Sequence, residues 1–562
     1  MIKHKKLLII IIIFGLILVT IGFSAYKTFK VGHNFDMSYL FSKKENKNYS
    51  ENDLFRNLVV KFVRESVNKY FTNQSIDYPE ELNKEGEWDL KITLYSQGKI
   101  LGQGKSDNKI LAYALEEAVK NIIEDKKLTQ EDVEKARFLV SLFSFSDQPF
   151  SFIETTSGVE GKEIIDDLVI IRNLDKELIR QKIEQGKEFL FKMMNKNDYG
   201  FYKIYDALDD SFEDRLHTVY SASIIYTFLY INDWKKDERT LEQIHNLGNF
   251  LLSMQNKDKQ DIRYGAFHYS YYLFTEEKEK KFVVGTSALS IFTLLRLYDL
   301  TNDPKYLESA KLAGDWLATM QKTDGSMKAY TKYSNGEWIY GTNESLLYNG
   351  QVLSALSKLY KATGEEKYYN TAERIVQRHV EKVEKEGCYL GDDYRLKNPI
   401  SSAWVVMSLL DFYKISQNEH YKNIIFECSN ELLERQRKDT NLLNNGQWEG
   451  AYSTSGTGWI SEVMADVYKF CLEQDREDCG QYKEGVIKGI RWIIQNTYSE
   501  ENSFLLKNPE RAIGGVFWNQ QNRYVRTDSV CHGLNGYTII INYLENGLLL
   551  SFPEESLEEI LK

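Results

Sequence analysis

This chain has fewer basic than acidic residues. Its 562 residues include 71 Lys and Arg against 82 Asp and Glu, so the formal net charge is −11. The part expected to fold contains no Lys/Arg-rich patch. Nucleic-acid-binding proteins need such patches to neutralise phosphates, so we expect no nucleic-acid partner. A chain this long exceeds one ordinary compact core, so we expect two domains or one large repeat array.

Cysteine is also scarce. All five cysteines lie after residue 387. Cys471 and Cys479 flank a turn between two expected helices and form the candidate disulfide pair, with two free thiols as the alternative. The cysteines are consistent with an oxidising compartment but do not require one.

A long apolar run stands at the N-terminus. Residues 7–23 carry no charge, have about the shortest length that spans a bilayer as a helix, and are flanked by lysines. The residues that follow offer only Ser24 and Ala25 as a cleavage site, so an uncleaved signal anchor over residues 1–30 is preferred to a cleaved signal peptide. We therefore expect a single-pass membrane protein whose main part is extracytoplasmic.

A small α+β domain is expected after a polar linker at residues 31–50. Its segments change between helical and alternating spacing of apolar residues. The domain should cover residues 51–172. Its expected elements are a helix at 54–71, a hairpin at 88–104 turning at Gln97 and Gly98, a helix at 110–122, and strands at 137–145 and 168–172.

This order of elements is weakly similar to that of the AMMECR-type domain. The LRGCIG-like stretch of that family would fall at residues 100–104, which read ILGQG and lack its Arg and Cys. The similarity therefore implies no chemistry for this domain.

From about residue 173 one pattern of two helices repeats six times. The first helix of each pair carries Lys, Glu and Arg on one side, and the second is apolar nearly all round. The first helices are expected near 175–195, 239–256, 304–321, 366–385, 419–437 and 481–498, and the second near 217–232, 285–300, 349–363, 400–416, 456–473 and 527–545.

Buried helices inside an amphipathic outer ring make an (α/α)6 toroid, expected over residues 173–547 with a C-terminal tail at 548–562. The fold class is thus mainly α: a toroid of six helical hairpins, preceded by a small α+β domain and one N-terminal transmembrane helix. Loops from outer to inner helices are roughly 14–30 residues long, more than compact packing needs. They all lead to the N-termini of inner helices, so we expect the functional site on this rim.

The pattern resembles the six-hairpin glycosidase-like superfamily of glycoside hydrolases, polysaccharide lyases and uronyl C5-epimerases. The stretch YNGQVLSALSKLYKATGEEKYYNTAERI at 348–375 is the most similar, above all to the C-terminal helical domain of glucuronyl C5-epimerases. The resemblance covers about two thirds of the chain. It implies the toroid fold and a carbohydrate substrate.

Two other families have similar helices. Squalene-type terpene cyclases share the Gln/Trp phrases of the outer helices, but their DxDD acid motif is absent here. Lanthipeptide cyclases bind zinc through a Cys-His-Gly sequence, which Cys531 and His532 would match, and through an earlier Cys. The preceding inner helix begins STSGTGW, so Cys388 would have to supply that ligand. Zinc sites in proteins have three or four protein ligands, and adjacent Cys and His alone supply only two. We therefore expect no metal and no cofactor.

The long loops carry residues suited to sugar chemistry, and loop one adds a run of aspartates. The candidates are Tyr340 and Glu344 in loop three; Asp392, Asp393, Tyr394 and Arg395 in loop four; Trp448, Glu449 and Tyr452 in loop five; and Trp518, Arg526, Asp528 and His532 in loop six.

Two kinds of chemistry fit these candidates. Glycoside hydrolysis needs two carboxyl groups across the scissile bond, which Asp392 or Asp393 would provide together with Glu449 or Asp528. Uronyl epimerisation or β-elimination needs a proton carrier and a cation that neutralises the carboxylate. Tyr340, Tyr394, Tyr452 or His532 would then carry the proton, and Arg395 and Arg526 would clamp the substrate.

Structural roles compete with these assignments. Asp528 fits a helix N-cap or a partner of Arg526, and His532 fits a hydrogen-bonded core histidine. The Asp392-Asp393 pair fits a turn. Trp448 followed by Glu449 is the preferred combination, because an aromatic platform beside an acid suits a sugar subsite.

These observations predict a membrane-anchored, extracytoplasmic carbohydrate-active enzyme. A glycoside hydrolase acting on an envelope or extracellular polysaccharide or oligosaccharide is preferred. A uronyl C5-epimerase or polysaccharide lyase is the first alternative. A non-catalytic toroid that binds a glycan or a protein is the second.

Overall fold

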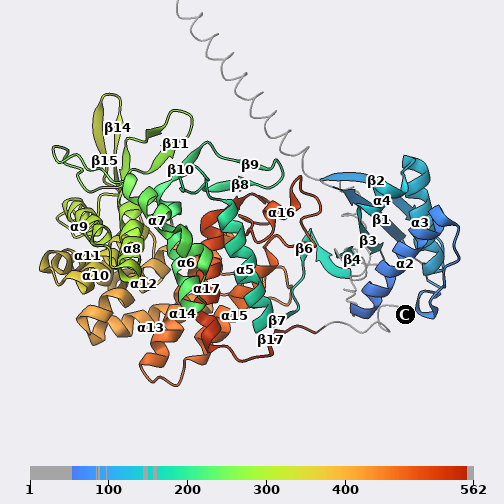
Figure 1. The fold of residues 1–562 in the computed structure, drawn as a ribbon. Helices are drawn as coiled ribbons and strands as arrows, with labels where there is room; N and C mark the ends of the chain where they lie inside the picture. Colours follow the sequence, from blue (N-terminus) through green and yellow to red (C-terminus); the bar gives the residue numbers. More distant parts are fainter. Residues whose placement is uncertain are drawn as a thin grey trace, which may run out of the picture.

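The computed structural model describes residues 53–83, 85–86, 89–96, 98–143, 150–155 and 161–553. The predicted anchor and linker lie outside these residues. None of the helices within them is long and apolar enough to cross a membrane. Figure 1 shows a small α+β domain beside a larger body of helices.

The α+β domain is one antiparallel sheet in the order β2-β1-β3-β4-β5-β6, with two long helices. The strands are β1 (Asp89–Ser96), β2 (Lys99–Ser106), β3 (Arg137–Phe143), β4 (Phe150–Glu154), β5 (Gly161–Ile165) and β6 (Leu168–Val169); the helices are α2 (Asp53–Thr72), α3 (Leu111–Lys126) and the short α4 (Gln130–Glu134). Both predicted helices and the predicted hairpin are confirmed. Strands β4 and β5 were not predicted.

Burial of alternate residues holds this sheet against its helices. Leu90, Ile92 and Leu94 of β1 are fully buried and belong to one core with residues of α2 and α3. Gly104 of β2 lies so close to α3 that a Cβ atom there would come within 1.9 Å of the Ala118 carbonyl oxygen. A side chain at this position would therefore push the helix off the sheet.

Twelve helices of the described stretch 161–553 form two concentric rings, which confirms the predicted toroid. The inner helices contact one another in sequence order, and the last contacts the first, so the ring is closed. The inner ring is α6 (Thr218–Trp234), α8 (Val284–Thr301), α10 (Leu346–Thr363), α12 (Pro399–Ser416), α14 (Thr454–Glu473) and α17 (Thr527–Ile540); the outer ring is α5 (Lys176–Lys192), α7 (Glu238–Ser253), α9 (Pro304–Thr319), α11 (Glu366–Glu386), α13 (Glu419–Glu434) and α15 (Gly480–Gln495).

A glutamine recurs just after the outer helices and bonds to the carbonyl oxygen of a loop glycine. We call this contact the Gln-Gly clasp. Gln255 donates from Nε2 to the carbonyl oxygens of Gly265 and Ser309, which ties its loop and the next outer helix together. Gln321 and Gln436 make the equivalent pair of bonds in their own hairpins. Gly265 has φ +89°, a region that favours glycine. The repeat thus encodes the contacts between neighbouring hairpins.

The residue two positions after each clasp glycine is buried and bridges back to the end of the outer helix. In three hairpins the backbone N–H of the bridging residue donates to a polar side chain in the first turn of the inner helix, as that of Phe267 does to Ser287 Oγ at 3.1 Å. This explains the small polar residues at the starts of the inner helices. The bridging residues are Phe201, Phe267, Met327, Trp448 and Val516.

Short antiparallel strands connect neighbouring long loops across the rim. Loop one pairs with loop two through β10 (Arg215–His217) and β11 (Ser270–Tyr272), and loop two with loop three through β13 (Lys281–Val283) and β14 (Tyr330–Ser334). Loop six returns to loop one through β16 (Val525–Arg526). Four further short strands lie beside these: β8 (Ile204–Asp206), β9 (Ser211–Phe212), β12 (Glu277–Lys278) and β15 (Glu337–Gly341).

The two ends of the toroid meet in a small sheet. Strand β17 (Leu548–Ser551) opens the segment predicted as a tail and pairs antiparallel with β7 (Asn173–Asp175), which directly precedes α5.

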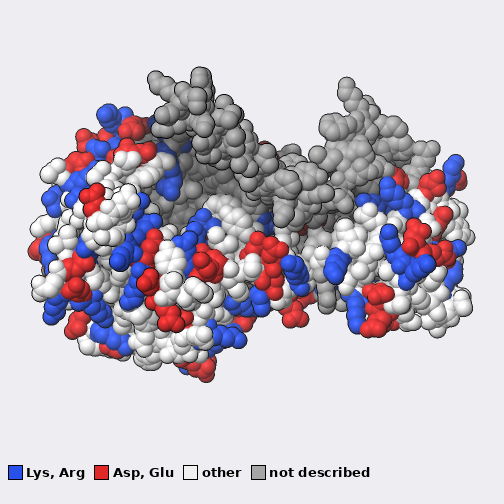
Figure 2. All heavy atoms as spheres, turned by 90° about the horizontal axis from the view of Figure 1, so that it is seen from above, with Lys and Arg blue, Asp and Glu red and all other residues white. Residues whose placement is uncertain are grey.

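On the face of the molecule that Figure 2 shows, Lys and Arg are intermixed with Asp and Glu, and no basic stripe is visible.

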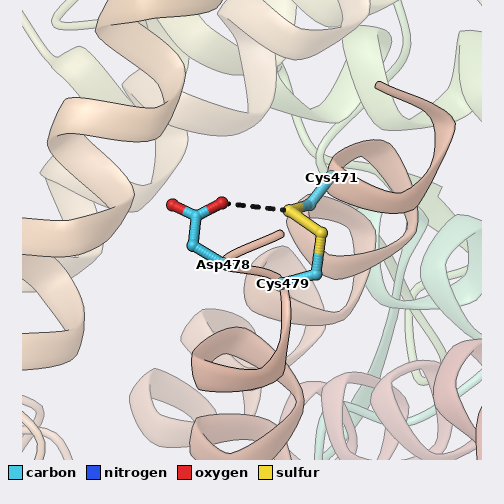
Figure 3. Close-up of side chains that lie close together, drawn as sticks. All are labelled: Cys471, Asp478 and Cys479. Carbon is cyan, nitrogen blue, oxygen red and sulfur yellow. Dashed lines mark hydrogen bonds between the residues drawn. A yellow bond between two sulfur atoms is a disulfide. The ribbon is translucent and has the colours of Figure 1, made fainter. Parts of the chain in front are cut away.

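Two disulfides link the second half of the toroid. The predicted bond between Cys471 and Cys479 is confirmed, and Figure 3 shows Asp478 beside it, with Oδ1 3.8 Å from Cys471 Sγ. Cys388 and Cys428 form a second disulfide that was not predicted. Cys531 is a buried free thiol.

A cluster of charges around the buried Asp411 lies toward the C-terminal ends of the inner helices. Lys358 Nζ lies 2.6 Å from Asp411 Oδ1, and Lys414 Nζ lies 3.5 Å from the same oxygen. Burial raises the pKa of Asp466 to about 6; Lys414 and Lys358 oppose this rise, whereas Glu462 and Asp411 add to it. Asp466 is therefore ionised at neutral pH at a cost to the folded state.

We expect Asp466→Asn to stabilise the protein at pH 7.5 and to have little effect at pH 4. Because the folded-state pKa lies above the ordinary 3.8, the stability contributed by Asp466 is complete below about pH 4 and is lost as pH rises through about 6. The gain at pH 7.5 should be about 1–2 kcal/mol after allowance for partial exposure. Denaturant unfolding at both pH values measures it. A gain that is equal at both values, or equal to that of the exposed control Glu477→Gln, would contradict this account.

Candidate functional site

The best-formed polar cluster on the rim is centred on the start of α17. Arg526 donates from Nε to Asp528 Oδ1 at 3.0 Å and from Nη2 to Asp528 Oδ2 at 2.6 Å. Ser455 of α14 donates its hydroxyl to Asp528 Oδ2 at 2.9 Å. Both oxygens of Asp528 therefore have partners.

Aromatic rings complete the surroundings of Arg526. Its guanidinium carbon lies 4.1 Å from the centroid of Trp518, and its Nη2 donates to the Tyr220 hydroxyl at 3.0 Å. Burial raises the pKa of Tyr220 well above 10, so this phenol stays protonated. Tyr220 can donate a hydrogen bond but cannot serve as a base at neutral pH.

The charge of Asp528 is fixed by its neighbours. Burial alone would raise the pKa of this carboxyl, but Arg526 and His532 outweigh burial and lower it. Asp528 is therefore an ionised acceptor that orients Arg526. A group with a lowered pKa cannot act as the protonated acid of glycoside hydrolysis.

His532 lies one turn further along α17 and is oriented by a carboxylate. Its Nδ1 lies 2.7 Å from Glu462 Oε2, and Asn535 donates from Nδ2 to Glu462 Oε1 at 3.0 Å. Among the described residues, no side chain or backbone group bonds to His532 Nε2. A ring nitrogen held by a carboxylate on one side and open on the other is the arrangement of a general base.

Two tryptophans border this histidine. Trp404 of α12 and Trp459 of α14 stack with centroids 3.9 Å apart, and the Trp459 ring lies 5.2 Å from the His532 ring. Both tryptophans are nearly buried. The stacked pair therefore forms an apolar wall on one side of the His532 ring.

A further carboxylate on loop one is already engaged. Glu213 Oε1 accepts from the backbone N–H groups of Lys203 and Ile204, and its Oε2 lies 3.0 Å from His217 Nε2. Burial opposes its ionisation, but the bond with His217 outweighs burial and lowers the pKa of Glu213. Each of the three carboxylates that form this cluster is thus fully partnered.

The structure brings four of the predicted residues together: Trp518, Arg526, Asp528 and His532. Sequence reasoning missed Tyr220, Trp404, Trp459 and Glu462. The two tryptophans did leave a signal, because SSAW and GTGW place a Trp at the same depth in successive inner helices. Glu462 is an acid in the middle of a mainly apolar inner helix, which is a second signal.

The aspartates of loop four join two loops. Asp392 Oδ2 accepts from the Leu346 backbone N–H at 2.8 Å, and its Oδ1 accepts from those of Tyr394 and Arg395. Asp393 Oδ2 accepts from the Glu344 backbone N–H at 2.7 Å. The structure supports the competing role, turn formation, for this pair.

Among the described residues, the other candidates of loops three and four form no hydrogen bond or ring contact with His532. Glu344 is buried and is held by Arg378 of outer helix α11, with both Nε and Nη2 at 3.2 Å from its oxygens. Tyr340, Tyr394 and Arg395 are exposed on their loops. Tyr394 and Tyr340 remain accessible to a long substrate but do not meet the cluster.

Loop five differs most from the expectation of an aromatic platform beside an acid. Trp448 is fully buried, and its indole N–H donates to the Leu432 carbonyl oxygen at 3.1 Å. It occupies the bridging position of its hairpin, so its ring has no face for a sugar. Glu449 and Tyr452 are exposed, and Glu449 is placed by its backbone bond to Arg435. Trp448 is therefore a core residue of its hairpin and not a sugar platform beside Glu449.

Comparison with known proteins supports the fold. The model of glycosyl hydrolase family 76 matches residues 273–393. No curated protein matches the chain. Cellobiose 2-epimerase from Bacillus thermoamylovorans B4167 is 14% identical with a TM-score of 0.53, covering 66% of this chain and 99% of its own.

Two further structures are similar over the same part of the chain. The cellobiose 2-epimerase from Spirochaeta thermophila DSM 6192 has 14% identity and a TM-score of 0.50, covering 66% of this chain and 97% of its own. A D-mannose isomerase has 12% identity and a TM-score of 0.51, covering 66% of this chain and 98% of its own. The chain has the six-hairpin glycosidase-like toroid fold.

Proposed function

We propose that this protein is a carbohydrate-active enzyme that moves a proton on a sugar carbon, as an epimerase or isomerase does. The observation that carries this proposal is His532, which has Nδ1 on Glu462 and Nε2 open beside two tryptophans. The fully partnered carboxylates of Asp528, Glu462 and Glu213 favour a histidine base over a carboxylic acid as the proton carrier. The solved epimerases and the isomerase with this fold give the proposal further support.

The chemistry follows from the positions of these groups. His532 Nε2 would take a proton from the carbon next to the carbonyl group of an open-chain sugar, and the electron pair would move onto the carbonyl oxygen. The Tyr220 hydroxyl and the Arg526 guanidinium would stabilise the resulting enolate oxygen. Return of the proton to the other face of the same carbon, after the enolate has turned that face toward His532, gives an epimer. Its return to the neighbouring carbon, with transfer of the proton of the first carbon's hydroxyl group to the former carbonyl oxygen, gives an isomer.

Glycoside hydrolysis is the second candidate, because the matched family is one of glycosyl hydrolases. The matched stretch ends at Asp393 and includes Asp392, so these two acids belong to this candidate. Their present hydrogen bonds would have to be exchanged for bonds to substrate. A uronyl epimerase or lyase would need a free cation for the substrate carboxylate. Asp528 already engages Arg526, so the exposed Arg395 would have to supply it.

We also propose that the enzyme is held at a membrane and works outside the cytoplasm, on an envelope or extracellular polysaccharide or oligosaccharide. The uncharged run at residues 7–23 supports the anchor. Two disulfides support an oxidising compartment, since cytosolic proteins rarely retain such bonds.

A screen in deuterated water tests the proposed reaction. Purified full-length protein should convert a reducing mono- or disaccharide into an epimer or isomer that carries deuterium at the carbon next to the carbonyl. NMR detects both the new sugar and the label. Release of new reducing ends without deuterium on carbon would instead establish hydrolysis. Binding of sugars without any turnover would establish the non-catalytic alternative.

A further inference from the structure

The small domain and the toroid share a hydrophobic contact of their own. Phe504 of the toroid packs on Tyr95, with ring centroids 4.7 Å apart, and joins a core of small-domain residues that includes Leu139 and Ile153. Arg523 Nη1 lies 3.0 Å from Asp167 Oδ2 across the same boundary. These contacts fix the position of one domain against the other.

A cavity of about 380 Å³ lies beside this contact. Its walls come from both domains: α2, β5 and the segment after β6 on one side, and α5 with the segment after α15 on the other. Ligand pockets have this size and are common at domain interfaces. The cavity is separate from the rim, since none of its lining residues belongs to the long-loop cluster around His532.

The cavity wall contains a buried ammonium group that has only a neutral partner. Lys182 of α5 is 9% exposed, and its Nζ donates to Gln185 Oε1 at 2.9 Å. Among the described residues, Lys182 Nζ forms no ion pair with a carboxylate. Burying an ammonium without a counter-charge is costly. Burial also lowers the pKa of Lys182, while Glu500 and Glu501 oppose that effect from a longer range.

Other lining groups favour an anion as the missing partner. Lys162 of β5 forms no ion pair with the described residues and faces the cavity from the small domain. The Ser499 hydroxyl is buried without a hydrogen-bond partner among the described residues. Three acids also line the cavity. Glu163 is already engaged, since Arg172 holds it with two bonds of 2.8 and 2.9 Å. Neither Glu500 nor Glu501 forms an ion pair with Lys182 among the described residues.

We propose that this interdomain cavity binds a small molecule through an oxyanion, phosphate or carboxylate, with Lys182 as its main partner. Lys162 and Ser499 complete the site, so the anion contacts both domains at once. The site is distinct from the proposed catalytic cluster. Its occupancy would strengthen the attachment of the small domain to the toroid.

Calorimetric titration of the full-length protein with inorganic phosphate and, separately, with glucuronate tests this proposal. We expect one of the two anions to bind at millimolar concentration or below. Lys182→Met should weaken that binding about 10- to 100-fold, the effect of losing a charge-assisted hydrogen bond. Binding of phosphate alone assigns a phosphorylated ligand, and binding of glucuronate alone assigns an acid. The exposed control Lys196→Met should bind as the wild type does.

Two results would overturn the proposal: neither anion binds the wild type, or Lys182→Met binds as tightly as the wild type. Ser499→Ala and Lys162→Met provide independent tests, each expected to weaken binding several-fold, if Lys182→Met fails to fold. In the absence of anion, Lys182→Met should unfold at the same temperature as the wild type or a higher one, because it removes an unpaired buried charge. Replacement of His532 should leave anion binding unchanged, so this test is independent of the catalytic proposal.

Discussion

Replacing His532 with asparagine should lower the turnover number of the proposed reaction about a hundred- to ten-thousandfold, the usual contribution of a general base. The asparagine side chain keeps a polar group near Glu462 but cannot take a proton from carbon. The Michaelis constant should change much less, because the tryptophans and Arg526 remain in place. Steady-state kinetics and the rate of deuterium incorporation measure the two effects.

Glu462→Gln should also slow the reaction, by less than the loss of His532 itself. The substitution keeps the bond to Asn535 but removes the charge that stabilises protonated His532. A Michaelis constant and a circular-dichroism spectrum close to those of the wild type separate this effect from a simple loss of fold. The exposed His245→Asn serves as control. Activity that survives His532→Asn but falls with Glu449→Gln would favour hydrolysis instead.

Removal of the disulfide between Cys388 and Cys428 should lower the free energy of unfolding by about 4 kcal/mol. The bond closes a loop of 40 residues, and the loop-entropy model gives about this value for that length. Cys388→Ala with Cys428→Ala avoids burying hydroxyl groups in a site that excludes water. Denaturant unfolding of the double variant measures the loss.

The second disulfide supplies the matched comparison. Cys471 and Cys479 are only 8 residues apart, so the same model predicts a smaller loss of about 2.5 kcal/mol for Cys471→Ala with Cys479→Ala. Denatured, unreduced wild type should show one reactive thiol, Cys531. Five reactive thiols in protein from an oxidising compartment would contradict both disulfides and weaken the extracytoplasmic proposal.

The toroid could be predicted because its signal is repeated and local. Gln255, Gln321 and Gln436 recur at the end of an outer helix, and each makes the same contacts. Six copies of one spacing leave little freedom in the order of helices. The strands of the rim could not be found in this way, because β10 and β11 are three residues long and depend on each other for their hydrogen bonds.

The position of Trp448 within the repeat indicates a core residue, although its neighbour Glu449 suggested a sugar-binding site. Trp448 lies two residues after the clasp glycine Gly446. The residues at the equivalent position of two other hairpins, Phe267 and Met327, are both buried. Aligning the hairpins would therefore have assigned Trp448 to the core. Glu462 and Trp459 come together with His532 only because α14 and α17 are neighbours in the closed ring. That proximity depends on tertiary structure, so motif spacing could not show it.

The closure of the ring by its last helix has a consequence for how the protein is made. Helix α6 packs on α17, and β7 pairs with β17, so the first hairpin lacks its partners until about 300 more residues have been synthesised. If the chain is exported from its N-terminus, the apolar surface of α6 stays exposed on the far side of the membrane until residues 527–551 have been exported. Folding after such an export would then depend on factors that shield the incomplete ring.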